Sequence, residues 1–147
     1  MNKPLVFAIS SACVAAALAV APTAQAKSYA FYYGDTAAVC FSGQVENKPH
    51  VECEVADPTF TAPKPPTTCQ GVWGNRIGMV QGAAPTFECH TDSLAALGPE
   101  YVVQGTPQII GSISCIDDPA GMKCTDTSTG NFFILATNSY QLNPPGS

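Results

Sequence analysis

Residues 115–124 read Cys-Ile-Asp-Asp-Pro-Ala-Gly-Met-Lys-Cys and decide the fold class of this chain. The two cysteines stand symmetrically about a turn that contains proline and glycine, with β-forming residues on both sides. Side chains alternate between faces along a strand, so only directly opposed cysteines come close enough to bond. A loop from Asp118 to Gly121 places Cys115 opposite Cys124. The disulfide would then also fix the register of this hairpin.

The first 26 residues have the pattern of a secretory signal peptide. Lys3 provides the charged start, the apolar run covers residues 5–21, and small residues precede an expected cleavage between Ala26 and Lys27. A membrane-spanning helix is the alternative, but no basic stop-transfer cluster follows the run. We therefore expect a secreted or cell-envelope protein of residues 27–147, without a membrane span after the signal is removed.

Cysteine content supports export. Cys13 is expected to leave with the signal, and the remaining cysteines are Cys40, Cys53, Cys69, Cys89, Cys115 and Cys124. An even number of cysteines in an exported chain predicts a disulfide framework. Hairpin geometry favours sequential pairing, because the first two cysteines are equidistant from the midpoint of Glu46 and Asn47. Zinc is the rival interpretation, but structural zinc sites use cysteines two to four residues apart, so no metal or cofactor is expected.

Charge and length limit the possible partners. From Lys27 onward five basic residues stand against eleven acidic residues, which gives a formal charge of −6. Nucleic acids and anionic lipid surfaces require clustered basic residues, so neither is an expected partner. A chain of this length supports a single domain with its own core.

The pattern along residues 27–147 predicts about eight short strands and no long helix. Aromatic residues at 27–35 predict an edge strand, and residues 37–41 and 50–55 a strand pair. The segment 57–68 is rich in proline, which predicts a surface crossover. Further strands are expected at 85–89, 109–116, 122–125, 132–135 and 139–142, with one short helical piece within 90–98. The predicted fold class is an all-β antiparallel sandwich or small barrel with three hairpin disulfides.

Candidate chemistry is sparse. His90 lies near Glu88 and Asp92, but no nucleophile motif accompanies it, so we expect it to be exposed at a strand end. Asp117 and Asp118 lack the alternating acids of a calcium loop and are explained by turn chemistry. No catalytic residues are assigned.

Several motifs occur together in the second half of the chain. They are Cys69 with Trp73 and Gly74, Phe87 with Cys89, residues 102–105, Ile113-Ser114-Cys115, Gly121-Met122-Lys123-Cys124-Thr125, Gly130 with Phe132 and Phe133, and Tyr140. This set resembles a family of small secreted actinobacterial proteins of unknown function with paired cysteines. The resemblance covers residues 69–142, and more weakly 39–53. It implies an exported β domain and no particular activity.

Three functions remain open. The first is a non-enzymatic interaction module that binds an extracellular protein or an envelope component. The second is a protease inhibitor, because a short loop held by a disulfide is preorganised for insertion into an active site. The third is a small hydrolase in which folding brings His90 together with an acid and a hydroxyl group.

Overall fold

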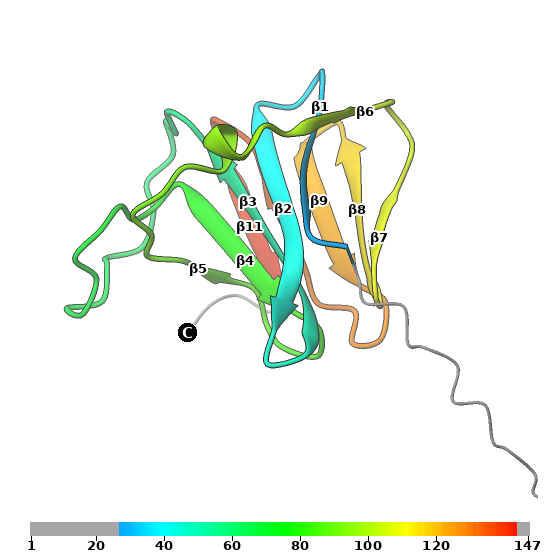
Figure 1. Cartoon of the computed structure of the whole chain (residues 1–147). Helices are drawn as coiled ribbons and strands as arrows, with labels where there is room; N and C mark the ends of the chain where they lie inside the picture. The colour runs from blue at the N-terminus through cyan, green and yellow to red at the C-terminus, as the bar shows by residue number, and fades with distance from the viewer. Residues whose placement is uncertain (1–26, 144–147) are drawn as a thin grey trace, which may run out of the picture.

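Two β-sheets pack face to face and enclose a core that contains two disulfides (Figure 1). The computed structural model describes residues 27–143, so the expected signal peptide and Ala26 lie outside the described residues. The all-β fold class and the three predicted disulfides are confirmed. Eleven strands form instead of about eight, and one expected strand, over residues 109–116, is divided by a turn.

The first sheet has six strands in the order β5-β4-β3-β2-β1-β6. The strands are β1 (Tyr29–Tyr33), β2 (Ala38–Val45), β3 (Lys48–Val55), β4 (Arg76–Val80), β5 (Thr86–Phe87) and β6 (Glu100–Val102). The prediction that residues 27–35 form an edge strand is wrong. β1 pairs with β2 on one side and, in parallel, with β6 on the other, so β6 is the edge.

The second sheet has five strands in the order β11-β10-β9-β8-β7. The strands are β7 (Gln108–Ile110), β8 (Ile113–Asp118), β9 (Gly121–Asp126), β10 (Phe132–Leu135) and β11 (Tyr140–Asn143). The single strand expected over 109–116 is in fact a hairpin of β7 and β8. Gly111 adopts a positive φ of 60° in the turn between them, a conformation that glycine adopts without steric cost.

The register of both cysteine hairpins follows the prediction. Cys40 pairs with Cys53 across β2 and β3, and Cys115 pairs with Cys124 across β8 and β9. The β2–β3 connection is shorter than expected, since the strands run to a two-residue turn of Glu46 and Asn47 with φ values of 49° and 63°. Positive φ at both central residues is typical of the hairpin turn that matches strand twist.

The third disulfide differs from the other two. Cys69 and Cys89 bond as predicted, but both lie outside the strands, and Cys89 is exposed. Beside them Val72 and His90 form an isolated antiparallel bridge, with the amide of Val72 donating to the carbonyl of His90 at 2.7 Å. The disulfide between Cys69 and Cys89 therefore holds a loop in place and does not link the two strands of a hairpin.

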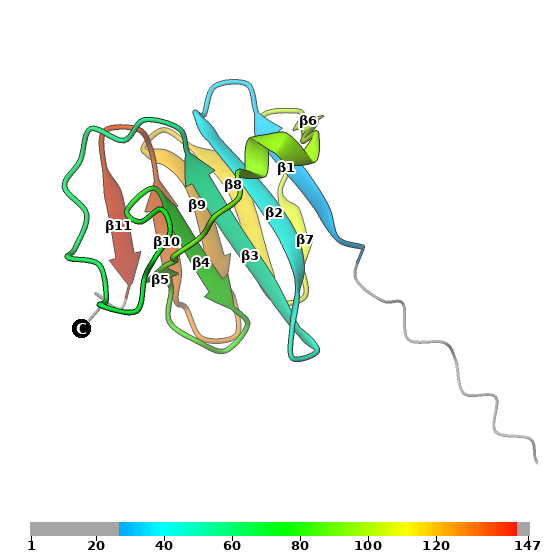
Figure 2. The same ribbon diagram turned by 60° about the vertical axis from the view of Figure 1, so that its left-hand side comes forward.

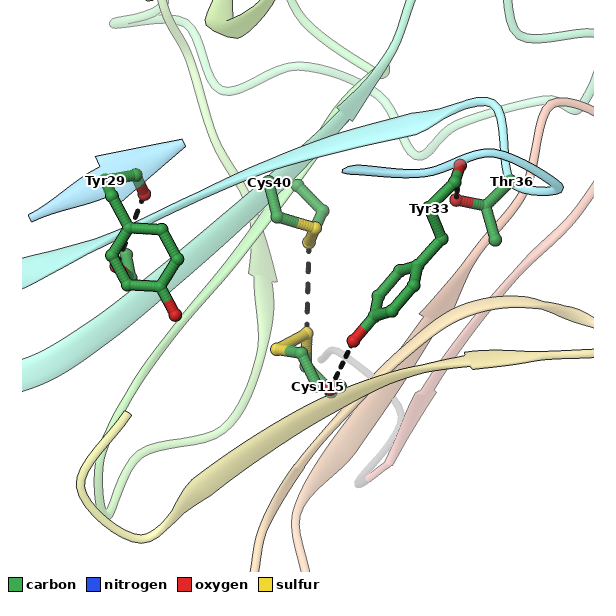
Figure 3. The surroundings of a disulfide bond; sticks show 8 residues. Tyr29, Tyr33, Thr36, Cys40 and Cys115 are labelled. Atoms are coloured by element: carbon green, nitrogen blue, oxygen red, sulfur yellow. Dashed lines mark hydrogen bonds between the residues drawn. A yellow bond between two sulfur atoms is a disulfide. The ribbon is translucent and has the colours of Figure 1, made fainter. Parts of the chain in front are cut away.

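The two core disulfides face each other from opposite sheets (Figure 3). Sγ of Cys53 lies 3.9 Å from Sγ of Cys124, and all four cysteines of these bonds are fully buried. Phe31 and Tyr33 of β1 are also fully buried, and the half-buried Tyr29 packs against the core. The interior thus consists of a sulfur layer surrounded by aromatic and aliphatic side chains.

Tyrosine hydroxyls close one side of the sandwich, where β1 and β6 lie near β7 (Figure 2). Tyr29 donates to Oε1 of Gln108 at 2.9 Å, and Tyr33 donates to the carbonyl oxygen of Thr106 at 2.6 Å. Burial raises the pKa of Tyr33 to about 12, and the charge of Asp117 adds to this effect. Each ring packs in the interior while its hydroxyl finds a partner.

A buried carboxylate connects the two sheets at the ends of the strands. Asp126 of β9 accepts hydrogen bonds from the amide of Gly82 at 2.6 Å and from the hydroxyls of Ser112 and Ser128, each at 2.6 Å. Burial alone would raise the pKa of Asp126, but these donors outweigh it and hold the pKa well below its usual range. The ionised carboxylate is therefore a structural component of the fold.

Residues 90–98 form no α-helix. The expected helical piece is a single 3-10 turn, Leu94–Leu97, which ends at Gly98 in the left-handed conformation. Ser93 occupies the N-cap position, and its side chain makes no capping bond. Leu94 is fully buried, and the turn contacts β2 from outside the first sheet.

Candidate functional site

The open side of the sandwich holds an aromatic groove, between the edge strands β5 and β11. It has a volume of about 670 Å³, which is within the range of ligand pockets. Its lining residues come from the proline-rich crossover, the two edge strands and the turns beside them: Pro63, Lys64, Pro66, Trp73, Pro85, Thr86, Phe87, Tyr140, Gln141 and Leu142. We call this set the aromatic groove.

Ring packing fixes the floor of the aromatic groove. The ring centroid of Phe87 lies 5.9 Å from that of Trp73 and 4.8 Å from that of Tyr140. Phe60 of the crossover stacks on Tyr140 at 4.9 Å. Such separations are typical of favourable aromatic pairs. The floor is therefore a connected cluster of rings that spans both sheets.

The crossover 57–68 forms one wall of the aromatic groove. It contains no strand, and hydrogen bonds to both sheets hold it in place. Nε1 of Trp73 donates to the carbonyl oxygen of Pro63 at 2.8 Å, and the amide of Thr59 donates to the carbonyl oxygen of Thr137 at 2.7 Å. The wall is anchored to both sheets, so the groove is formed before any ligand arrives.

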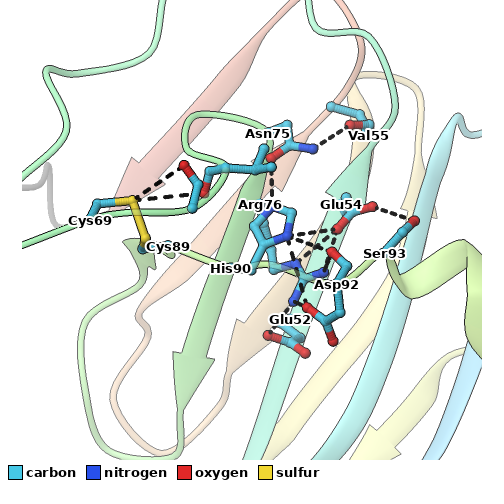
Figure 4. A network of polar contacts seen from close by, with 12 residues as sticks. Glu52, Glu54, Val55, Cys69, Asn75, Arg76, Cys89, His90, Asp92 and Ser93 are labelled. Atoms are coloured by element: carbon cyan, nitrogen blue, oxygen red, sulfur yellow. Dashed lines mark hydrogen bonds and ion pairs between the residues drawn. A yellow bond between two sulfur atoms is a disulfide. The ribbon is translucent and has the colours of Figure 1, made fainter.

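A polar network covers the outer face of the first sheet (Figure 4). Arg76 of β4 is 3% exposed, and its Nε donates to Oε2 of Glu54 on β3 at 2.9 Å. Its Nη1 also lies 3.1 Å from Oδ1 of Asp92 and 3.5 Å from Oε2 of Glu52. A buried guanidinium held by carboxylates from three positions fastens the segment after β5 onto the sheet.

His90 belongs to this network, and the expectation that it is exposed is wrong. It is 8% exposed, with Nδ1 donating to the carbonyl oxygen of Asp92 at 2.7 Å. Its Nε2 lies 2.8 Å from Oδ1 of Asn75, whose amide nitrogen donates to the carbonyl oxygen of Val55. Both ring nitrogens are thus engaged inside the protein. His90 and Glu88 do not converge, because the carboxylate of Glu88 turns to another histidine.

That other histidine is His50, and with Glu52 and Glu88 it forms a second polar group, which we call the His50 cluster. One ligand atom from each residue lies within 4.8 Å of the others. Nε2 of His50 is 3.3 Å from Oε1 of Glu88. Burial raises the pKa of Glu52 to about 7, with further contributions from its hydrogen bond to Glu88 and from the charge of Glu88. Burial would also raise the pKa of Glu88, but hydrogen bonds from His50 and Glu52 lower it below its usual range.

The hairpin tip that dominates the sequence has a structural role. Asp118 pairs with Gly121, so the turn contains only two residues, Pro119 and Ala120. The Asp118 carboxylate accepts from the amide of Ala120 at 2.9 Å, and the Asp117 carboxylate accepts from that of Gly105 at 2.6 Å. The first contact confirms that turn chemistry explains Asp118, whereas Asp117 holds the loop that precedes β7.

Neither the aromatic groove nor the His50 cluster was predicted from the sequence. The groove depends on packing between segments far apart in the chain, which no local pattern reveals. The cluster did leave a signal, because His50 and Glu52 alternate with Val51 in a predicted strand and so share one face. Gly78 on the neighbouring strand pairs with Glu52, and a glycine inside a strand often marks a position where another group approaches the backbone closely.

Within residues 27–143 no helix is long and apolar enough to cross a membrane. Comparison with family models, with curated proteins and with solved structures finds no match to this chain.

Proposed function

We propose that the protein is a non-enzymatic interaction module of the extracellular space or cell envelope, and that the aromatic groove is its ligand site. The observation that carries the proposal is a preformed groove with three aromatic rings on its floor and prolines in its walls. The signal-like start and three disulfides support an exported location.

The chemistry of the lining favours binding over catalysis. Among residues 27–143, Lys64 and Tyr140 are the only titratable residues that line the aromatic groove, so this part of the chain supplies no carboxylate or imidazole there for general acid–base chemistry. The hydrolase alternative would need His90, whose ring nitrogens are both engaged by protein groups. The inhibitor alternative relies on the hairpin tip, where the turn consists of Pro119 and Ala120 and so offers little chain for an active site to bind.

The expected ligand is an extended, proline-containing peptide that carries an acidic residue. Grooves lined by aromatic residues bind polyproline-type segments, whose preformed conformation reduces the entropy lost on binding. Lys64 is exposed at the wall and is the one charged residue among the described residues of the lining, and its charge complements a carboxylate. β11 is also the edge of its sheet, so its outer backbone groups are available to an extended chain.

The test is a selection from a library of extended peptides against oxidised residues 27–147, followed by titration of the selected peptides. Trp73 is the single tryptophan, so its fluorescence reports occupation of the groove directly. We expect selected peptides to contain proline and an acid, and Lys64→Glu to weaken their binding about tenfold, which corresponds to one charge-assisted contact.

Tyr101→Ala is the matched control, because Tyr101 is 58% exposed on β6 at the other edge of the first sheet. Its loss should leave peptide binding unchanged. Selection of no peptide, or of peptides whose binding is equally insensitive to Lys64→Glu and Tyr140→Ala, would overturn the proposal.

A further inference from the structure

We propose that the His50 cluster is a binding site for a divalent transition-metal cation of the zinc type. Its three members supply one imidazole nitrogen and two carboxylates, which is a ligand set that Zn²⁺ accepts with water in the fourth position. The inference is independent of the peptide ligand proposed for the aromatic groove.

The distances fit such a cation. Ligands about 2.0–2.1 Å from a tetrahedral zinc ion lie roughly 3.3–3.4 Å from one another. Nε2 of His50 and Oε1 of Glu88 are already 3.3 Å apart, and the Glu52 ligand atom lies within 4.8 Å of both. The proposed set is complete once the Glu52 carboxylate moves closer to the other two ligand atoms.

The arrangement of the strands brings the three side chains close together. His50 and Glu52 are two residues apart on β3, so both project from the outer face of the first sheet. Glu88 follows β5, and its carboxylate reaches back across β4 over Gly78, which pairs with Glu52. A Cβ atom at Gly78 would overlap with the carboxylate of Glu88. The absence of a side chain at this one position thus provides the space in which the ligands meet.

The charge around the cluster also favours a cation. Arg76 faces Glu52, Glu54 and Asp92, and its close contacts are to the last two. The guanidinium lies 3.5 Å from Glu52, and no ion pair joins it to Glu88 among residues 27–143. One guanidinium therefore faces four carboxyl groups, and two of them, Glu52 and Glu88, lie side by side at the His50 end of the network. A divalent ion bound there would stabilise the ionised form of both.

Water can reach the cluster. The side chains of His50, Glu52 and Glu88 are 11%, 15% and 27% exposed, so the site is half-open and not sealed inside the core. An ion can enter from solvent and keep a water ligand there. By contrast, the other close group of potential ligands, Cys40, Cys53 and Cys124, is committed to disulfides.

The test is titration of oxidised, EDTA-treated residues 27–147, without a histidine tag, with ZnCl₂ in a calorimeter and with CoCl₂ in a spectrophotometer. We expect one equivalent of either ion with micromolar affinity or better, and Co²⁺ absorption bands in the visible range. In the wild-type protein, Zn²⁺ should shift the imidazole NMR signals of His50 and leave those of His90 in place.

Three variants test the geometry. Glu52→Gln and Glu88→Gln keep side-chain shape and should each weaken Zn²⁺ binding at least about tenfold, since each removes one ionised ligand. Gly78→Ala leaves all ligands present but displaces the Glu88 carboxylate, so it should weaken binding as well. Circular dichroism and thermal melting establish that each variant is folded.

Asp92→Asn is the matched control, because Asp92 belongs to the same network but not to the cluster. It should bind Zn²⁺ as the wild-type protein does. No uptake of either ion, a Zn²⁺-dependent shift at His90 instead of His50, or undiminished affinity in both glutamine variants would overturn the site.

Discussion

The buried carboxylate of Asp126 gives the sharpest prediction about stability. In Asp126→Asn an amide group replaces one carboxylate oxygen. If the remaining oxygen keeps the hydroxyls of Ser112 and Ser128, the new NH₂ group faces the amide of Gly82, which now donates at 2.6 Å to Oδ2. A buried donor without an acceptor costs about 1–3 kcal/mol, and the bonds that remain lose the assistance of the charge.

We therefore expect Asp126→Asn to lower the free energy of unfolding by about 3 kcal/mol, a large part of the ~5–15 kcal/mol typical of a domain. Urea unfolding at pH 7, followed by circular dichroism with the disulfides intact, measures it. The midpoint should fall while the dependence on urea concentration stays unchanged. Asp117→Asn on the adjoining strand is the control. Its carboxylate accepts one backbone amide at an exposed site, so its effect should be below about 1 kcal/mol.

The pH dependence of this difference has a defined sign. The native pKa of Asp126 is lowered, so the unfolded chain binds more protons than the native protein in acid. The stabilisation is complete above the unfolded pKa of about 4 and is lost progressively as the pH falls below it. The difference in the free energy of unfolding between the wild-type protein and Asp126→Asn should therefore become smaller as the pH falls from 5 to 2.5. If this difference in unfolding free energy is the same at pH 7 and pH 2.5, the stabilising role assigned to the carboxylate is refuted.

Two further predictions concern the core and its bonds. Tyr33 has a raised pKa of about 12, so ultraviolet titration should show one tyrosine that ionises only near that pH, and Tyr33→Phe should remove this late step. The native phenol holds its proton longer than the unfolded one, so stability should fall as the pH rises from about 10 towards 12. Mild reduction followed by alkylation and mass spectrometry should release the bond between Cys69 and Cys89 first, because Cys89 is exposed while the other two disulfides are fully buried. Reduction of all three disulfides at the same rate would contradict this order.

Local patterns in the sequence were sufficient for the hairpins. Alternation along each strand, together with the symmetry of Cys115 and Cys124 about a turn, defined the register that the structure has. The pairing of Cys69 with Cys89 was also predicted, although the hairpin geometry used to argue it does not occur there. Short-range geometry determines these features, so one sequence contains the necessary information.

Long-range packing was not accessible in the same way. The parallel pairing of β1 with β6 joins Phe31 to Glu100, and nothing in either segment indicates the other. His90 was expected at the surface because its burial depends on Asn75 and on the segment that follows β5. The aromatic groove arises for the same reason, from a crossover that folds back over two sheet edges.

The contact between the core disulfides has a consequence for how the chain oxidises. Sγ of Cys53 and Sγ of Cys124 touch across the two sheets, although their native partners lie within their own sheets. If the sheets associate while the bond between Cys40 and Cys53 is open, the Cys53 thiolate can attack Sγ of Cys124. This breaks the bond between Cys115 and Cys124, releases the Cys115 thiolate and forms a disulfide between the sheets. Correct maturation therefore favours closing each hairpin before the two halves meet, so the order of events is part of what this core requires.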